Sequence, residues 1–197
     1  MMDFNVILFD DFETLDAFGP VEVIGRLPEY YRLRYYSLNG GIVKSSQQIQ
    51  INTLPLTEIN PSGILLIPGG MGTRVFVNDK DFVEQIKSLS EKASYVLTVC
   101  TGSVLLAKTG LLNGMKATSN KKALEWVSSN AAEVNWMKKA RWVKDGKFYT
   151  SSGVSAGIDM TLGFLCDIYG CEKSKTIACD IEYIWNADKE NDPFAVL

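Results

Sequence analysis

The sequence contains no histidine among its 197 residues. A catalytic triad or dyad built on an imidazole is therefore excluded, and so is any metal site with histidine ligands. The four cysteines form no Cys-x-x-Cys pair, so a zinc site would need all four from distant segments. We therefore expect no metal and no cofactor.

Long hydrophobic runs and an excess of positive charge are also missing. No apolar stretch approaches the roughly 18 residues of a membrane span, and Met1–Asn5 lacks the basic segment of a signal peptide. The 20 lysines and arginines are outnumbered by 23 aspartates and glutamates, which disfavours binding to nucleic acid or to an anionic membrane. We expect a cytoplasmic protein with reduced thiols.

Composition and length favour one globular domain. Hydrophobic residues make up 46% and charged residues 22% of the chain, which excludes a disordered or fibrous protein. A domain has roughly 100–200 residues, and we find no repeat, low-complexity tract or linker. The expected organisation is a single domain over residues 1–197, in which about 186–197 form a C-terminal tail.

Short apolar runs alternate with helical patterns along the chain. Almost wholly apolar runs such as Ile64–Ile67 are typical of strands that are buried on both faces of a parallel sheet. The predicted strands are 5–9, 32–37, 42–45 and 48–51 after a turn at Asn39-Gly40-Gly41, then 64–67, 95–99, and the hairpin 141–144 with 147–151. The predicted helices begin near Pro20, at an Asn78 N-cap, and at residues 102 and 121, with two more between 155 and 185 divided at Gly170. The alternation predicts an α/β sandwich with a mostly parallel central sheet.

Cys100 stands where a β-branched strand changes into a helix, within the run YVLTVCTGSVLL. Such an abrupt turn strains the central backbone and projects the side chain away from the sheet, as in a nucleophile elbow. The thiol would face the positive end of the helix dipole, which favours the thiolate. We therefore predict a reactive, ionised Cys100. The other three cysteines, Cys166, Cys171 and Cys179, are interpreted as small buried hydrophobic residues.

Two further segments supply what a thiol nucleophile needs. Successive glycines in Pro68–Gly72, after the strand at 64–67, leave backbone N–H groups free to face an anion. Without histidine, proton transfer falls to a carboxylate near a strand end: Asp10, Asp11 or Asp16. Asp16 has apolar neighbours on both sides, which suits an acid in a pocket, although a helix cap or a loop turn explains it equally well.

Together, the segments 15–20, 68–70 and 100–103 resemble the DJ-1/PfpI superfamily, and within it the isocyanide (isonitrile) hydratase branch. Segments 110–114 and 155–159 agree with this resemblance. It implies a flavodoxin-like three-layer sandwich, usually dimeric, with an elbow cysteine and a small-molecule substrate, so we expect a homodimer.

The resemblance also implies a role for each site residue. Asp16 would donate and accept protons, Thr101 would contact the site, and the backbone amides of Gly70 and Thr101 would form the oxyanion hole. Asn120 stands where many relatives carry a histidine, a departure that disfavours peptidase activity and leaves a cysteine–aspartate mechanism intact.

We therefore predict that the protein hydrates an isocyanide to an N-substituted formamide, with Cys100 as the nucleophile and Asp16 as the general acid and base. One alternative is another thiol enzyme, either glyoxalase-like or an amidase. The other is a non-enzymatic module that senses redox state or binds a ligand, in which Cys100 would be oxidised reversibly.

Overall fold

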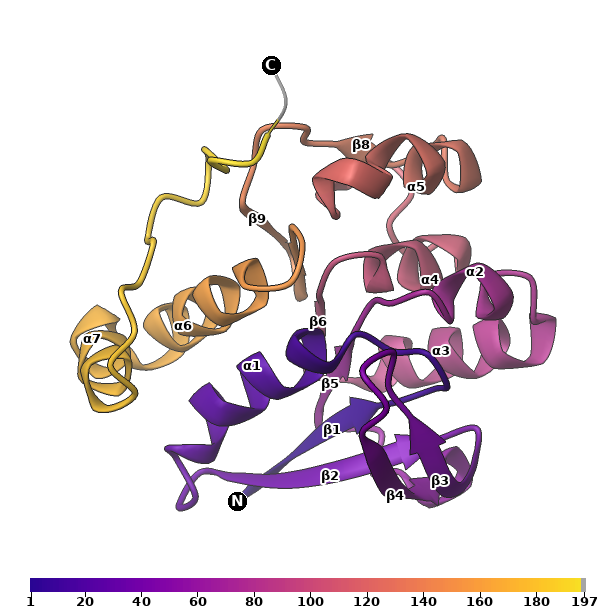
Figure 1. The fold of residues 1–197 in the computed structure, drawn as a ribbon, viewed down its shortest axis with the longest axis horizontal. Coiled ribbons are helices and arrows are strands. Elements are labelled where there is room, and N and C mark those ends of the chain that lie inside the picture. Colours follow the sequence, from indigo (N-terminus) through magenta and orange to yellow (C-terminus); the bar gives the residue numbers. More distant parts are fainter. Residues whose placement is uncertain (196–197) are drawn as a thin grey trace.

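The computed structural model describes residues 1–195, in which an eight-stranded sheet lies between two groups of helices (Figure 1). The strands are β1 (Met2–Ile7), β2 (Tyr31–Ser37), β3 (Asn39–Lys44), β4 (Gln50–Pro55), β5 (Ile64–Ile67), β6 (Tyr95–Thr98), β9 (Trp142–Asp145) and β10 (Phe148–Ser151), with a separate pair β7 (Lys116–Ala117) and β8 (Asn135–Trp136). The helices are α1 (Thr14–Gly25), α2 (Thr73–Phe76), α3 (Lys80–Lys92), α4 (Gly102–Lys108), α5 (Leu124–Asn130), α6 (Ala156–Tyr169) and α7 (Cys171–Asp180), with short 3-10 helices η1 (Leu56–Glu58) and η2 (Lys121–Ala123).

The sheet has the order β3-β4-β2-β1-β5-β6-β10-β9. Pairing is parallel from β4 through β10, and only the two edge pairs, β3 with β4 and β9 with β10, are antiparallel. Every residue of β5 is buried, as its apolar run predicted, because helices cover both faces of the sheet. This arrangement confirms the predicted mostly parallel α/β sandwich, and it brings the carboxyl ends of β1, β5 and β6 to one edge.

Several predicted bounds differ from the structure: the strand expected at 5–9 is Met2–Ile7, and the helix expected from residue 121 is η2 followed by α5. The first helix begins at Thr14, not near Pro20, and Pro20 lies inside it because close packing against α6 holds the helix. A Cβ on Gly19 would lie 2.8 Å from a side-chain carbon of Ile158, so these helices are in tight contact. The glycines predicted to form a turn at 39–41 lie within β3. Helix α3 is capped by Asp79, whose carboxylate accepts the N–H of Phe82 at 3.0 Å, and not by Asn78.

The interpretation of three cysteines as buried, reduced hydrophobic residues is wrong. A disulfide joins Cys166 to Cys171, with their Cα atoms 4.1 Å apart. The chain reverses at Gly170, where φ is +87°, so the first residue of α7 returns beside the last turn of α6. Cys179 is exposed because α7 turns Ile177 and Ala178 towards the core.

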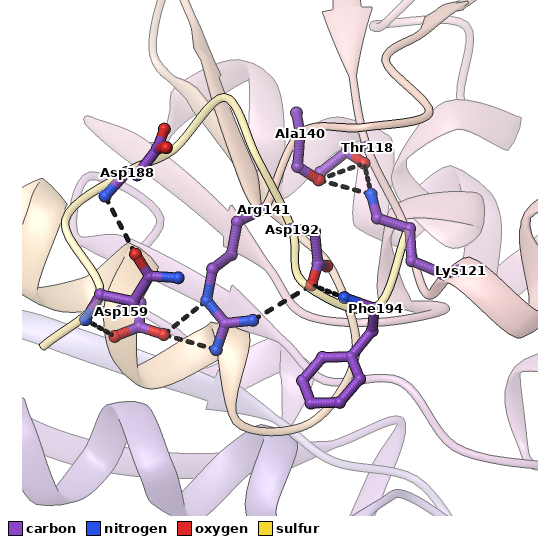
Figure 2. Close-up of polar contacts among 9 residues, drawn as sticks. Thr118, Lys121, Ala140, Arg141, Asp159, Asp188, Asp192 and Phe194 are labelled. Carbon is purple, nitrogen blue, oxygen red and sulfur yellow. Dashed lines mark hydrogen bonds and ion pairs between the residues drawn. The ribbon is translucent and has the colours of Figure 1, made fainter. Parts of the chain in front are cut away.

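The C-terminal tail runs along the surface of the chain itself and is described as far as residue 195; the last two residues of the predicted tail, 196 and 197, lie outside the described residues. A buried Arg141 fastens it (Figure 2): the guanidinium lies 2.6 Å from Asp159 of α6 and 3.3 Å from Asp192 of the tail. Backbone bonds add to this contact, since Arg141 N–H donates to the Lys189 carbonyl at 2.8 Å and Asp192 N–H to that of Lys139 at 2.7 Å. Within residues 1–195, every helix is too short or too polar to cross a membrane.

Candidate active site

Cys100 forms the turn between β6 and α4 in a strained conformation. Its φ is +56°, in the left-handed region that non-glycine residues rarely adopt. Its N–H donates to the carbonyl of Ser152 at 3.1 Å, and its own carbonyl accepts the Ser119 hydroxyl at 2.8 Å. The following Gly102 is required here, because a Cβ would lie 2.7 Å from the Pro68 carbonyl oxygen. The predicted elbow is therefore present, and neighbouring segments hold it rigidly.

Asp16 lies in the first turns of α1 and is fully buried. Its Oδ2 accepts the N–H of Gly69 at 2.9 Å, whereas Oδ1 has no well-aligned donor within the described residues. Burial raises the pKa of this carboxyl to about 7, and the charge of Glu13 adds to the rise. The Gly69 amide, the Cys100 thiol and the Val154 amide lower the pKa, but by less. The structure thus brings the two predicted side chains together, with an acid that titrates near neutral pH.

The expectation that Cys100 is ionised in the resting protein is wrong. The residue is only 7% exposed, and burial followed by the negative charge of Asp16 raises the pKa of the thiol to about 12. The backbone N–H of Thr101 and the side chain of Asn120 lower the pKa, but they do not offset burial. Burial and the neighbouring acid therefore favour the protonated thiol, and the resting pair is a thiol beside a carboxyl group.

The glycine turn lies against both residues. A Cβ on Gly69 would lie 2.6 Å from the Thr101 nitrogen and 2.8 Å from Asp16 Oδ2, so only glycine allows this approach. The two amides expected to form the oxyanion hole differ. That of Thr101 faces the Cys100 sulfur, whereas that of Gly70 already donates to the Thr101 hydroxyl at 3.1 Å. The Thr101 hydroxyl therefore already accepts the hydrogen bond that the Gly70 N–H would have to donate to an oxyanion.

A cavity of about 280 Å³ opens beside the Cys100 sulfur. Asp16 does not line it and lies behind the sulfur, where solvent does not reach. The lining residues come from five segments of the chain and include Glu13, Met71, Arg74, Asn120, Lys122 and Val154. Val154 has φ +47°, a strained conformation for a β-branched residue.

Asn120 has a larger part in the site than the sequence indicated. Its side chain interacts with the Cys100 thiol and lowers the pKa of that thiol. Its Oδ1 accepts the N–H of Lys122 at 3.0 Å, which fixes the side chain at the start of η2. A Cβ on Gly153 would overlap this amide, so the neighbouring loop also holds it in place.

The charged residues Glu13, Arg74 and Lys122 were not identified from the sequence. Each lies within a few residues of a predicted site residue or of Asn120 in the sequence. This proximity in sequence is the one signal that could have identified them. Among residues 1–195, no group of three or more cysteine, aspartate or glutamate side chains is placed to hold a metal ion.

The chain is similar in sequence and in fold to known proteins. The model of the DJ-1/PfpI family matches residues 3–166. Isonitrile hydratase of Pseudomonas putida is 28% identical over 92% of this chain and 78% of its own length. The crystal structure of a ThiJ/PfpI family protein from Pseudomonas syringae superposes with a TM-score of 0.84 at 23% identity, covering 98% of this chain and 77% of that one.

A regulator shares the same module. The transcriptional regulator CdhR of Pseudomonas aeruginosa is 26% identical over 85% of this chain, which spans 51% of the regulator. Similarity of sequence and fold therefore extends to proteins of different activity, and the choice between them depends on the site itself.

Proposed function

Because this chain belongs to the DJ-1/PfpI family, as its motifs predicted, we propose that it is a cysteine-dependent enzyme that hydrates an isocyanide to an N-substituted formamide. Cys100 is the nucleophile and Asp16 is the general acid and base. The observation that carries the proposal is the buried Asp16 carboxyl, with a pKa of about 7, directly behind a thiol that opens onto a cavity. The similarity to isonitrile hydratase of Pseudomonas putida supports this choice of substrate.

The first step adds the S–H bond across the isocyanide carbon, which is electrophilic and also carries a lone pair. Asp16 accepts the thiol proton while the sulfur forms a bond to carbon, and it then delivers that proton to the same carbon. Oδ1 of Asp16 is the oxygen available for this transfer, because Oδ2 already accepts the Gly69 N–H. The product is a thioimidate on Cys100.

The second step adds water to the thioimidate carbon. Asp16 takes a proton from the water and passes it to the nitrogen while the hydroxide adds to the carbon, which gives a tetrahedral intermediate. Breaking the carbon–sulfur bond then releases the formamide, and Asp16 transfers the hydroxyl proton of the intermediate to the sulfur. One water is consumed for each isocyanide, and the enzyme is regenerated.

The pKa values suit this sequence of proton transfers. An acid–base group is most effective when its pKa lies near the working pH, as it does for Asp16. The N–H of Thr101 and the side chain of Asn120 both lower the pKa of the thiol, so they stabilise the negative charge that grows on the sulfur during attack.

Formamide production by purified variants tests the proposal. Cys100→Ala should show no turnover of an aryl isocyanide, and Asp16→Asn should lower kcat by about 10²–10⁴-fold, the usual contribution of a positioned acid–base group. Cys179→Ala, which removes an exposed thiol on α7, should keep wild-type activity. Wild-type rates in the Cys100→Ala protein would refute the assignment.

Parallel assays with methylglyoxal and with simple amides distinguish the other thiol enzymes, which would use the same pair of residues. Turnover of one of these substrates, without turnover of the isocyanide, would reassign the reaction and keep the roles of Cys100 and Asp16. If no substrate is turned over and mild peroxide oxidises Cys100 reversibly, the chain is a redox-sensing module instead.

A further inference from the structure

Two cationic side chains line the opening of the cavity beside Cys100. Arg74 belongs to α2 and Lys122 to η2, and both are exposed. Within residues 1–195, neither cation has a carboxylate within 4.0 Å. The cavity therefore has two positive charges at its mouth, and neither forms an ion pair within the described residues.

The Arg74 side chain is held in place, unlike most exposed arginines. Its guanidinium lies over the ring of Trp126, 4.6 Å from the ring centroid, and its Nη1 contacts the sulfur of Met71 at 3.5 Å. A cation held over an aromatic face loses less freedom when it binds an anion, and a guanidinium can donate two parallel hydrogen bonds to a carboxylate. The geometry thus favours recognition of a planar anion.

Among the described residues, one acidic side chain, Glu13, also lines this cavity, so two cations and one anion face it. Glu13 Oε2 accepts a hydrogen bond from Gln47 Nε2 at 3.0 Å. Met71 and Ala123 add apolar surface to the wall of the cavity. The cavity accordingly combines a thiol, an apolar wall and two cations within about 280 Å³, enough for a small organic molecule with one anionic end.

We propose that the substrate carries a carboxylate, which Arg74 and Lys122 bind while its reactive carbon meets the Cys100 sulfur. The identity of that carbon as an isocyanide rests on the function proposed above, whereas the anionic subsite rests on the cavity alone. The two cations are specificity-determining residues that act on binding and take no part in proton transfer.

The rate of Cys100 alkylation tests the subsite without any turnover. Iodoacetate and iodoacetamide attack sulfur with the same carbon, but only iodoacetate carries a carboxylate. Peptide mass spectrometry gives the iodoacetate-to-iodoacetamide rate ratio separately for Cys100 and for the exposed Cys179, which serves as the internal reference. Each cation should raise the ratio for Cys100 roughly fivefold at low ionic strength, as expected for unit charges a few ångströms apart in water.

Arg74→Met and Lys122→Met should each lower the Cys100 ratio, the double variant should lower it by roughly tenfold or more, and added salt should weaken the preference in the wild type. Lys138→Met removes an exposed cation that does not line the cavity and should leave the ratio unchanged. A Cys100 ratio that is the same in the wild type and in the double variant would overturn the proposal.

A matched pair of substrates then connects the subsite to the reaction. The kcat/KM for 4-isocyanobenzoate should exceed that for its methyl ester in the wild type, and the Arg74→Met and Lys122→Met substitutions should remove the difference. If neither isocyanide is turned over while the alkylation ratio still falls in the variants, the isocyanide assignment fails and the anionic subsite stands. Equal kcat/KM values for the two isocyanides in the wild type would count against the subsite alone.

Discussion

Replacing Asp16 by asparagine removes a fully buried carboxyl whose pKa in the folded protein is about 7, against an ordinary value of 3.8. Between these two pH values the folded protein keeps a proton that the unfolded chain has released. The stability of the wild type should therefore fall as the pH rises from about 4 to about 7. Below this range the carboxyl is protonated in both states and above it ionised in both, so its contribution is constant there.

The size of the effect follows from the gap between the two pKa values. Each unit is worth ~1.4 kcal/mol, so a rise from 3.8 to about 7 costs the wild type roughly 4 kcal/mol of unfolding free energy at pH 8. The Asp16→Asn protein has no titratable group at this position, so its unfolding free energy does not show this decrease with rising pH. Its amide oxygen can still accept the N–H of Gly69, so any difference in fit adds an offset that does not depend on pH.

Urea denaturation of both proteins at intervals from pH 4 to pH 8 measures the difference directly. The unfolding free energy of the variant minus that of the wild type should increase by roughly 4 kcal/mol across this range, because other titratable groups cancel in the subtraction. Glu84→Gln, which replaces an exposed acid on α3, is the matched control and should give a difference that does not vary with pH. A constant difference for Asp16→Asn would show that the buried carboxyl does not retain its proton.

Two pairs of substitutions test the packing and the ion network, again by urea denaturation. Gly69→Ala should cost about 1–3 kcal/mol because its methyl group would overlap Thr101; Gly25→Ala, with its nearest neighbour atom at 3.8 Å, should change stability by less than about 1 kcal/mol. Arg141→Met should cost about 3–5 kcal/mol because two buried carboxylates lose their partner, whereas Lys144→Met, at an exposed ion pair, should cost less than about 1 kcal/mol. Equal losses within either pair would contradict the reasoning.

The sequence predicted the parts of the fold whose structure follows from a run of neighbouring residues, such as a strand in which every residue is buried. The run Ile64–Ile67 is a strand with the predicted bounds because both of its faces are covered. The hairpin of β9 and β10 was predicted from Asp145-Gly146, and Gly146 has the positive φ that such a turn needs, +57°. The elbow at Cys100 followed from the same kind of local signal, a strand that ends at one residue.

The parts that the sequence did not predict depend on contacts between distant segments. The start of α1 is set by packing against α6, which no local pattern around Pro20 encodes. The cations at the cavity, Arg74 and Lys122, come from α2 and η2, which are separated by more than 40 residues along the chain. They line the same cavity only in the folded protein. The fastening of the tail likewise depends on Arg141, whose partners Asp159 and Asp192 are distant in the sequence.

The ionisation of Cys100 is the most informative of these differences, because it bears on the choice between an enzyme and a redox sensor. A sensor cysteine is a thiolate that peroxide can reach, whereas burial raises the pKa of the Cys100 thiol to about 12. Such a thiol becomes nucleophilic only when its proton moves to an acceptor, and Asp16, with a pKa of about 7, is already adjacent. Binding of an electrophile in the cavity makes the proton transfer from Cys100 to Asp16 favourable, because the new bond between sulfur and carbon removes the negative charge from the sulfur. We therefore expect Cys100 to react with a bound substrate rather than to be oxidised at rest.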